Sequence, residues 1–67
     1  MKLSIHCDRE EDGRWIAEVP EIPGVMVYGK DQREAIAKVQ ALALRVVAER
    51  LEHDESTPNF HIYFAAA

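Results

Sequence analysis

Residues 19–35 read Val-Pro-Glu-Ile-Pro-Gly-Val-Met-Val-Tyr-Gly-Lys-Asp-Gln-Arg-Glu-Ala and contain most of the topological signals of the chain. Pro20 has no amide hydrogen to donate, so a strand is expected to end before it. Pro23-Gly24 predicts a turn. The apolar, strand-forming residues 25–28 then predict a short strand.

A long helix is expected to follow this strand. Asp31 and Glu34 have the spacing of a capping box, in which each side chain accepts a hydrogen bond from the other end of the first turn. Apolar residues then recur at the spacing of one helical face as far as about Leu51. Leu44 lies off this stripe and extends the apolar surface around the helix. The stripe consists of Ala35, Ile36, Val39, Leu42, Ala43, Val46 and Val47.

Two strands are predicted before residue 19. Leu3, Ile5 and Cys7 alternate with polar residues, which is the pattern of a strand with one buried face. The polar run 9–13 ends this strand, and Asp12-Gly13 is a hairpin signal, because glycine accepts a positive φ angle at no steric cost. In the second strand, Trp15, Ala17 and Val19 face one way, and Arg14, Ile16 and Glu18 face the other.

The polar segment 53–58 ends the helix, and residues 60–64 predict a final strand, while Ala65 to Ala67 carry no pattern. The helix is a crossover that returns this strand parallel to one of the first three, which form an antiparallel meander. We therefore predict a single α+β domain over residues 1–67, of order β-β-β-α-β, with one helix packed on one face of the sheet.

The other face of the sheet has no second helix to cover it. It should carry Ile16, Met26 or Val27, Tyr28 and Tyr63 among polar residues. A domain of 67 residues buries only roughly 60% of the surface of its unfolded chain, so its own core is marginal. A half-apolar open face on such a domain predicts self-association, as a dimer or a tetramer.

Composition limits the classes of partner and the compartment. The net charge is -4 and the basic residues are dispersed, which disfavours direct nucleic-acid binding. An acidic surface suits a basic partner, although it also serves solubility. The first residues do not form a signal peptide, and no apolar run approaches the roughly 20 residues of a membrane span. A soluble cytoplasmic protein is expected, in agreement with the unpaired Cys7.

Residues 8–24 read Asp-Arg-Glu-Glu-Asp-Gly-Arg-Trp-Ile-Ala-Glu-Val-Pro-Glu-Ile-Pro-Gly and resemble the N-terminal domain of HicB-type antitoxins. In that family an acidic hairpin containing glycine precedes a strand that ends in Pro-x-x-Pro-Gly. A short strand, a glycine and a helix starting with Glu-Ala follow. Gly29, Glu34 and Ala35 occupy the last of these positions, and the resemblance covers roughly residues 3–50.

This resemblance implies a partial RNase H-like fold and a protein that neutralises HicA, a small basic RNA-cleaving toxin, by covering its active surface. Many family members also carry a C-terminal DNA-binding domain. Only three alanines follow Phe64, so we expect a short form without that domain and without autoregulatory DNA binding.

The relation to RNase H raises the alternative of a metal-dependent nuclease. Asp8 and Glu34 could contribute carboxylates, but the last strand offers His61 where another acid is needed. His6 and Cys7 are adjacent, so they point to opposite faces and cannot act as a base and nucleophile pair. We expect no catalytic residue, cofactor or metal, with Cys7 in the core and the three histidines dispersed on the surface.

The leading hypothesis is therefore a non-catalytic antitoxin-type module, and its alternative is an orphan structural or regulatory module that self-associates. The acidic hairpin is either a solvated turn or an electrostatic contact for a basic toxin. Trp15 is expected in the core rather than at an interface. Turn and cap roles are assigned to Gly13, Pro20, Pro23, Gly24, Gly29, Asp31 and Glu34. The candidate partner-binding residues are Asp8, Glu10, Glu11, Asp12, Ile16, Met26, Tyr28 and Tyr63.

Overall fold

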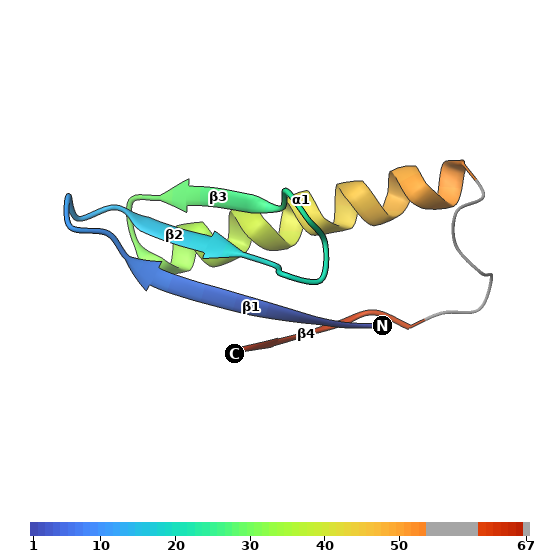
Figure 1. Ribbon diagram of the computed structural model, residues 1–67, viewed down its shortest axis with the longest axis horizontal. Coiled ribbons are helices and arrows are strands. Elements are labelled where there is room, and N and C mark those ends of the chain that lie inside the picture. The colour runs from blue at the N-terminus through green and yellow to red at the C-terminus, as the bar shows by residue number, and fades with distance from the viewer. Residues whose placement is uncertain (54–60, 67) are drawn as a thin grey trace.

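A four-stranded mixed sheet with one helix on one of its faces makes up the fold (Figure 1). The computed structural model of the chain describes residues 1–53 and 61–66. The sheet has the order β3-β2-β1-β4, in which β1 pairs antiparallel with β2 and parallel with β4, and β2 pairs antiparallel with β3. The predicted α+β architecture is confirmed. The elements are β1 (Lys2–Arg9), β2 (Trp15–Glu18), β3 (Met26–Gly29), α1 (Gln32–Glu52) and β4 (Tyr63–Ala66).

The hairpin between β1 and β2 is closed by backbone and side-chain hydrogen bonds. Glu10 N–H donates to Arg14 O at 2.7 Å, and Gly13 N–H donates to Glu10 O at 3.0 Å. Gly13 has a φ of 93°, the left-handed conformation that the sequence predicted for this glycine. Asp12 accepts hydrogen bonds from both the backbone N–H and the Nε of Arg14, so contacts between two residues of the turn stabilise its conformation.

The Pro-Glu-Ile-Pro-Gly segment is a turn that contributes to the core. Val19, Ile22 and Val25 are all buried, and Val19 N–H donates to Val25 O while Val25 N–H donates to Ile22 O. Because Val19 and Val25 belong to this turn, β2 ends at Glu18, one residue before its predicted end, and β3 begins at Met26, one residue after its predicted start. Beside Pro20, which has no N–H, the carboxylate of Glu21 accepts the backbone N–H of Ser4 at 3.0 Å.

The helix begins at Gln32 with Asp31 as its N-cap. Asp31 Oδ1 accepts the N–H of Glu34 at 2.8 Å, as predicted. The reciprocal bond of a capping box is displaced by one residue, because Glu34 Oε1 accepts the N–H of Lys30, at 3.1 Å, rather than that of Asp31. This hydrogen bond, together with Lys38 Nζ at 3.3 Å, lowers the pKa of Glu34.

Gly29 is required by the close approach of β3 to the first turn of α1. Gly29 is buried, and a Cβ built on it would lie 2.5 Å from Ala35 N and 2.8 Å from Ala35 Cα. Its φ is not in the left-handed region, so the constraint is steric. The role predicted for Gly29 was a turn residue, whereas the structure shows that it lets the strand contact the helix backbone.

The core lies between α1 and the inner face of the sheet. Ala35, Val39, Ala43 and Val47 are its buried helix residues, at the spacing of one face. The predicted stripe residues Ile36, Leu42 and Val46 are half-buried along its sides, and Trp15 and Cys7 also pack against the core, as expected. Among residues 1–53 and 61–66, no helical segment combines the length and the hydrophobicity of a membrane span. The buried strand and turn residues are Leu3, Ile5, Ala17, Val19, Ile22 and Val25.

The final strand differs from its prediction. It was expected over residues 60–64, but β4 spans Tyr63–Ala66, and Phe60 lies outside the described residues. Two of the three alanines that carried no pattern pair in the sheet, with Ser4 opposite Ala65 and Ile5 opposite Ala66. The reason is that parallel pairing uses backbone groups, which alanine supplies as well as any other residue.

Candidate functional site

The outer face of the sheet, which is turned away from α1, carries the predicted apolar residues. The strand register places Asp8 beside Ile16 and Ile16 beside Tyr28. Met26 lies on the same face, opposite Glu18. Met26 and Tyr28 are 49% and 40% exposed, and Ile16 is half-buried. We call Ile16, Met26 and Tyr28 the outer patch; it is bordered by the carboxylates of Asp8 and Glu18.

A chain of charged contacts joins the acidic hairpin to the outer patch. The guanidinium of Arg14 lies 4.3 Å from the centroid of the Tyr28 ring. Its Nε is 2.7 Å from Asp12 Oδ2. Hydrogen bonds from Arg14 lower the pKa of Asp12, so this carboxylate stays ionised to a lower pH than a free aspartate. Asp12 therefore positions Arg14 over Tyr28.

The hairpin remains acidic after this pairing. Over residues 8–14 four acidic residues against two arginines leave a net charge of -2. Glu10, Glu11, Asp12 and Arg14 line a shallow depression at the tip. Because Asp12 is held by Arg14, the carboxylates of Asp8, Glu10 and Glu11 are the groups best placed for a basic partner.

Tyr63 is not part of this cluster, although the sequence grouped it with the other candidates. It lies on the same face and is 58% exposed, but it pairs with Lys2 on β1, six residues from Asp8. At about 3.3 Å per residue, this separates Tyr63 from the row of Ile16 and Tyr28 by roughly 20 Å along the strands.

The residues considered for nuclease chemistry lie apart. Asp8 is on the outer face, Glu34 is in the first turn of α1 on the other side of the sheet, and His61 precedes β4. Among residues 1–53 and 61–66, no three His, Cys, Asp or Glu side chains are grouped so that they could hold a metal ion. His6, on β1, and His53, at the helix end, are likewise separate.

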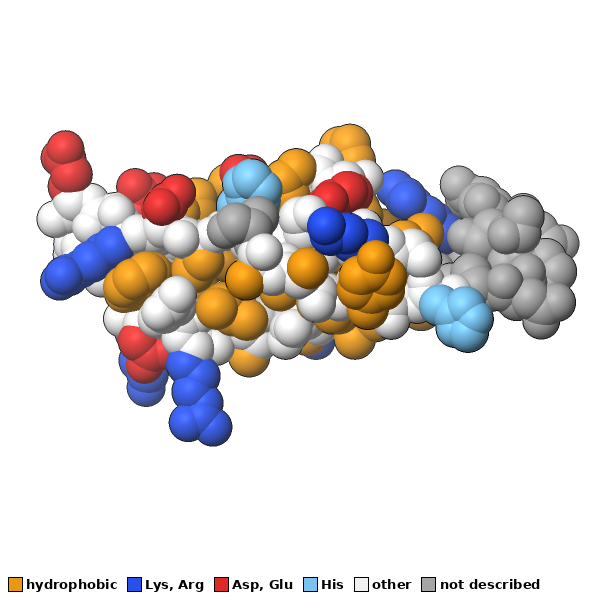
Figure 2. Space-filling view, turned by 90° about the horizontal axis from the view of Figure 1, so that it is seen from below, with side chains coloured by type: hydrophobic (Ala, Val, Ile, Leu, Met, Phe, Trp, Pro, Cys, Tyr) orange, Lys and Arg blue, Asp and Glu red, His pale blue; other side chains and the backbone are white. Residues whose placement is uncertain are grey.

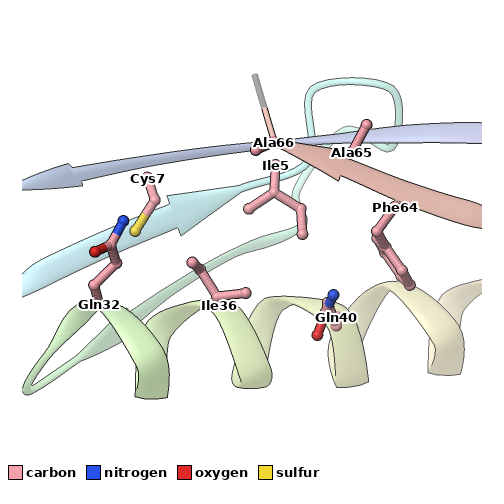
Figure 3. A pocket seen from close by; sticks show the side chains of 8 residues that line it. All are labelled: Ile5, Cys7, Gln32, Ile36, Gln40, Phe64, Ala65 and Ala66. Carbon is pink, nitrogen blue, oxygen red and sulfur yellow. The ribbon is translucent and has the colours of Figure 1, made fainter.

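A groove of mixed polar and apolar lining opens at the edge where β1 and β4 face the helix. Figure 2 shows a band of hydrophobic side chains along this side of the molecule, with charged side chains above and below it. The groove has a volume of about 290 Å³. Figure 3 shows the helix residues Gln32, Ile36 and Gln40 facing Ile5, Cys7 and Phe64 across it. Its lining consists of Ile5, Cys7, Gln32, Ile36, Gln40, Phe64, Ala65 and Ala66.

This groove was not predicted from the sequence, because it depends on where β4 stops. The pairing with β4 reaches Ile5, whereas β1 continues to Arg9. Burial, with a smaller contribution from Asp8, raises the pKa of the Cys7 thiol, which therefore stays protonated and weakly nucleophilic near neutral pH. The groove can receive an apolar side chain; the polar groups of its lining are the Cys7 thiol and the two glutamine amides.

Comparison with known proteins identifies a relative of similar size. The UPF0150 protein Ta0767 of Thermoplasma acidophilum is 34% identical over 59 residues, which cover 87% of this chain and 84% of that protein. No family model matches the chain, and no solved structure matches it. An identity of 34% over most of both chains is sufficient to assign the two proteins to one family. The chain therefore belongs to the UPF0150 family.

Proposed function

We propose that this protein is a non-catalytic, HicB-like antitoxin-type module that binds a small basic RNase toxin of the HicA kind. The resemblance of residues 8–24 to HicB antitoxins supports this function, and so does membership of a family of small proteins. The proposal puts the protein in the cytoplasm, where such a toxin would meet its RNA.

The outer patch is the observation that carries the proposal. It is apolar at its centre and bordered by carboxylates, which is the anatomy of a protein interface with a hydrophobic core and a polar rim. The acidic hairpin lies at one end of it. Carboxylates at the rim would attract a basic partner and increase its association rate, while Met26 and Tyr28 would supply the apolar contact.

Preorganisation of the hairpin supports the same surface. Asp12 holds Arg14, and Arg14 stacks on Tyr28, so the turn and the patch are already fixed relative to each other. Ordering flexible side chains normally opposes binding by about 0.5–1.5 kcal/mol for each side chain. A surface whose side chains are held in place before binding avoids part of that loss.

The test uses the tagged chain as bait in its native cell and a matched pair of variants. Wild-type bait should recover a small basic protein, and the purified partner should cleave RNA only after the bait is removed. Met26→Glu should reduce recovery at least tenfold. Leu44→Glu is the control, since Leu44 has a matched exposure, 47% against 49%, but lies on the helix. Recovery of no basic RNase by the wild type, or equal recovery with both variants, would contradict the proposal.

A self-associating structural or regulatory module remains the second candidate function. The observation that favours it is the exposure of Leu44 and Leu51 on α1, at 47% and 39%. These side chains lie on the opposite layer from the outer patch. The two functions are compatible in one molecule, because they use different surfaces.

A further inference from the structure

The side of α1 that faces away from the sheet carries a second apolar stripe. Its residues are exposed, in contrast to the buried face at residues 35, 39, 43 and 47. They follow one another at intervals of four, three, four and three residues, the spacing of the contact seam in paired helices. We call this stripe the helix back face; it consists of Ala37, Ala41, Leu44, Ala48 and Leu51.

The back face has no cover within the described residues. The helix packs against β1, β2 and β3, and all three strands lie on its other side, as Figure 1 shows. From residue 37 to residue 51 the back face extends about 21 Å at 1.5 Å per residue. This is long enough for about four layers of side chains from a second helix.

We propose that the helix back face binds the back face of a second copy of this chain, with the two helices antiparallel. When a two-fold axis passes beside residue 46, Leu44 faces Ala48 of the second copy, and Leu51 faces Ala41. Each of the four layers between residues 41 and 51 then pairs one leucine with one alanine, and Ala37 lies beyond the last layer. This constant size across the layers permits the usual helix spacing of about 8–10 Å.

The charges that border the back face select the antiparallel orientation. On this border Lys38 lies near the N-terminal end, Arg45 near the middle, and Glu49 and Glu52 near the C-terminal end. Antiparallel helices bring Lys38 of each copy beside Glu52 of the other, whereas parallel helices would leave these two residues about 21 Å apart along the helix axis. Arg45 lies near the axis, where its own Glu49, one turn later, offsets repulsion between the two arginines.

The contact leaves the sheet free. Lys38 Nζ already lies 3.3 Å from Glu34 Oε1, so in the dimer it would lie between two carboxylates. A standard interface buries about 800 Å² on each partner, roughly a sixth of the 4850 Å² that this molecule exposes. Four layers bury less than this, and we therefore expect a reversible dimer whose outer patches point in opposite directions.

Analytical ultracentrifugation of the full chain over a concentration series tests this dimer. The wild type should show a monomer–dimer equilibrium, and Leu44→Glu should raise the Kd at least tenfold. Met26→Glu, the matched change on the sheet, should leave the Kd unchanged. A wild type that remains monomeric overturns the proposal and leaves the proposed partner binding untouched. A dimer lost in Met26→Glu but kept in Leu44→Glu also overturns it, because the outer patch would then be the self-association surface.

Charge exchange tests the orientation. Lys38→Glu alone and Glu52→Lys alone should each weaken the dimer several-fold, because each places like charges at both ends of the seam. The double variant, and an equimolar mixture of the two single variants, should restore it. Since Lys38→Glu also places a like charge beside Glu34, the double variant controls for that local effect. Failure of both restorations would refute the antiparallel arrangement.

Discussion

Replacement of Gly29 by alanine should destabilise this domain strongly, because the new methyl group has no space. The built Cβ lies 2.5 Å from Ala35 N, 2.8 Å from Ala35 Cα and 3.1 Å from Ala35 Cβ. Carbon atoms in contact are normally about 3.5–4.0 Å apart, so β3 and α1 would have to separate by roughly 1 Å. Two of the three atoms are backbone atoms, which cannot rotate away.

The expected loss of stability is about 2 kcal/mol, within the range of roughly 1–3 kcal/mol for overpacked positions. For a domain of this size, each kcal/mol shifts Tm by about 4–8 °C, so Gly29→Ala should lower Tm by roughly 8–16 °C. Circular dichroism during heating, at one fixed protein concentration, measures this shift. The fixed concentration matters because self-association also raises Tm.

A second substitution separates backbone contact from side-chain contact. Ala35→Gly removes only the most distant of the three atoms, so the double variant Gly29→Ala/Ala35→Gly should be no more stable than Gly29→Ala. Gly13→Ala is the control for backbone conformation, since Gly13 has a positive φ and open space around it. A Tm for Gly29→Ala within about 3 °C of the wild type, or its recovery in the double variant, would refute the steric argument.

Three further tests, which use five substitutions, concern the helix cap, the acid limit of stability and the core. Asp31→Ala should cost about 1 kcal/mol in urea unfolding, because Glu34 N–H loses its acceptor, and Asp31→Gly should cost less. The pKa of Glu34 is lower in the folded state than in the unfolded state, so the folded state binds a proton at Glu34 less readily. The ionised Glu34 carboxylate therefore contributes its full stabilisation above about pH 4.5, and this stabilisation declines as pH falls through the lowered pKa. Glu34→Gln should therefore flatten the dependence of the urea midpoint on pH below this value, and an unchanged slope would count against the hydrogen bond from Lys30. Val39→Ala should cost about 2 kcal/mol, whereas Leu44→Ala in dilute protein should stay within about 0.5 kcal/mol of the wild type, and equal effects would contradict the assignment of the two helix faces.

Periodicity and turn chemistry were sufficient to predict most of the fold. The alternation around Leu3 and Ile5, the two prolines and the Asp31 cap each have a local physical cause, and each gave the element that the structure contains. The alanines of β4 could not be assigned, since alanine has no preference that reveals backbone pairing with a distant strand. Which backbone N–H donates to the Glu34 carboxylate depends on where Lys30, the residue after β3, lies relative to the helix, and this is a tertiary feature.

The candidate sites were predicted less completely. Alternation placed Ile16, Met26 and Tyr28 on the open face, but the separation of Tyr63 follows from strand register, which no local pattern records. The stacking of Arg14 on Tyr28 also depends on register. On the helix, the sequence pattern placed Leu44 outside the core stripe. It did not identify the exposed alanines beside Leu44, because alanine occurs on both the buried and the exposed face of α1.

The parallel attachment of β4 to β1 has a consequence for the order in which the domain assembles. The amino group of Met1 donates to the carbonyl of His61, and Tyr63 N–H donates to Met1 O, so this contact joins positions about 60 residues apart. The β1–β2 hairpin closes over only a few residues. Closing the longer loop costs about 2 kcal/mol more entropy, so we expect β1, β2, β3 and α1 to form first and β4 to join last. Until then the edge of β1 that will pair with β4 is unpaired, and the newly made chain is most exposed to incorrect strand pairing during that interval.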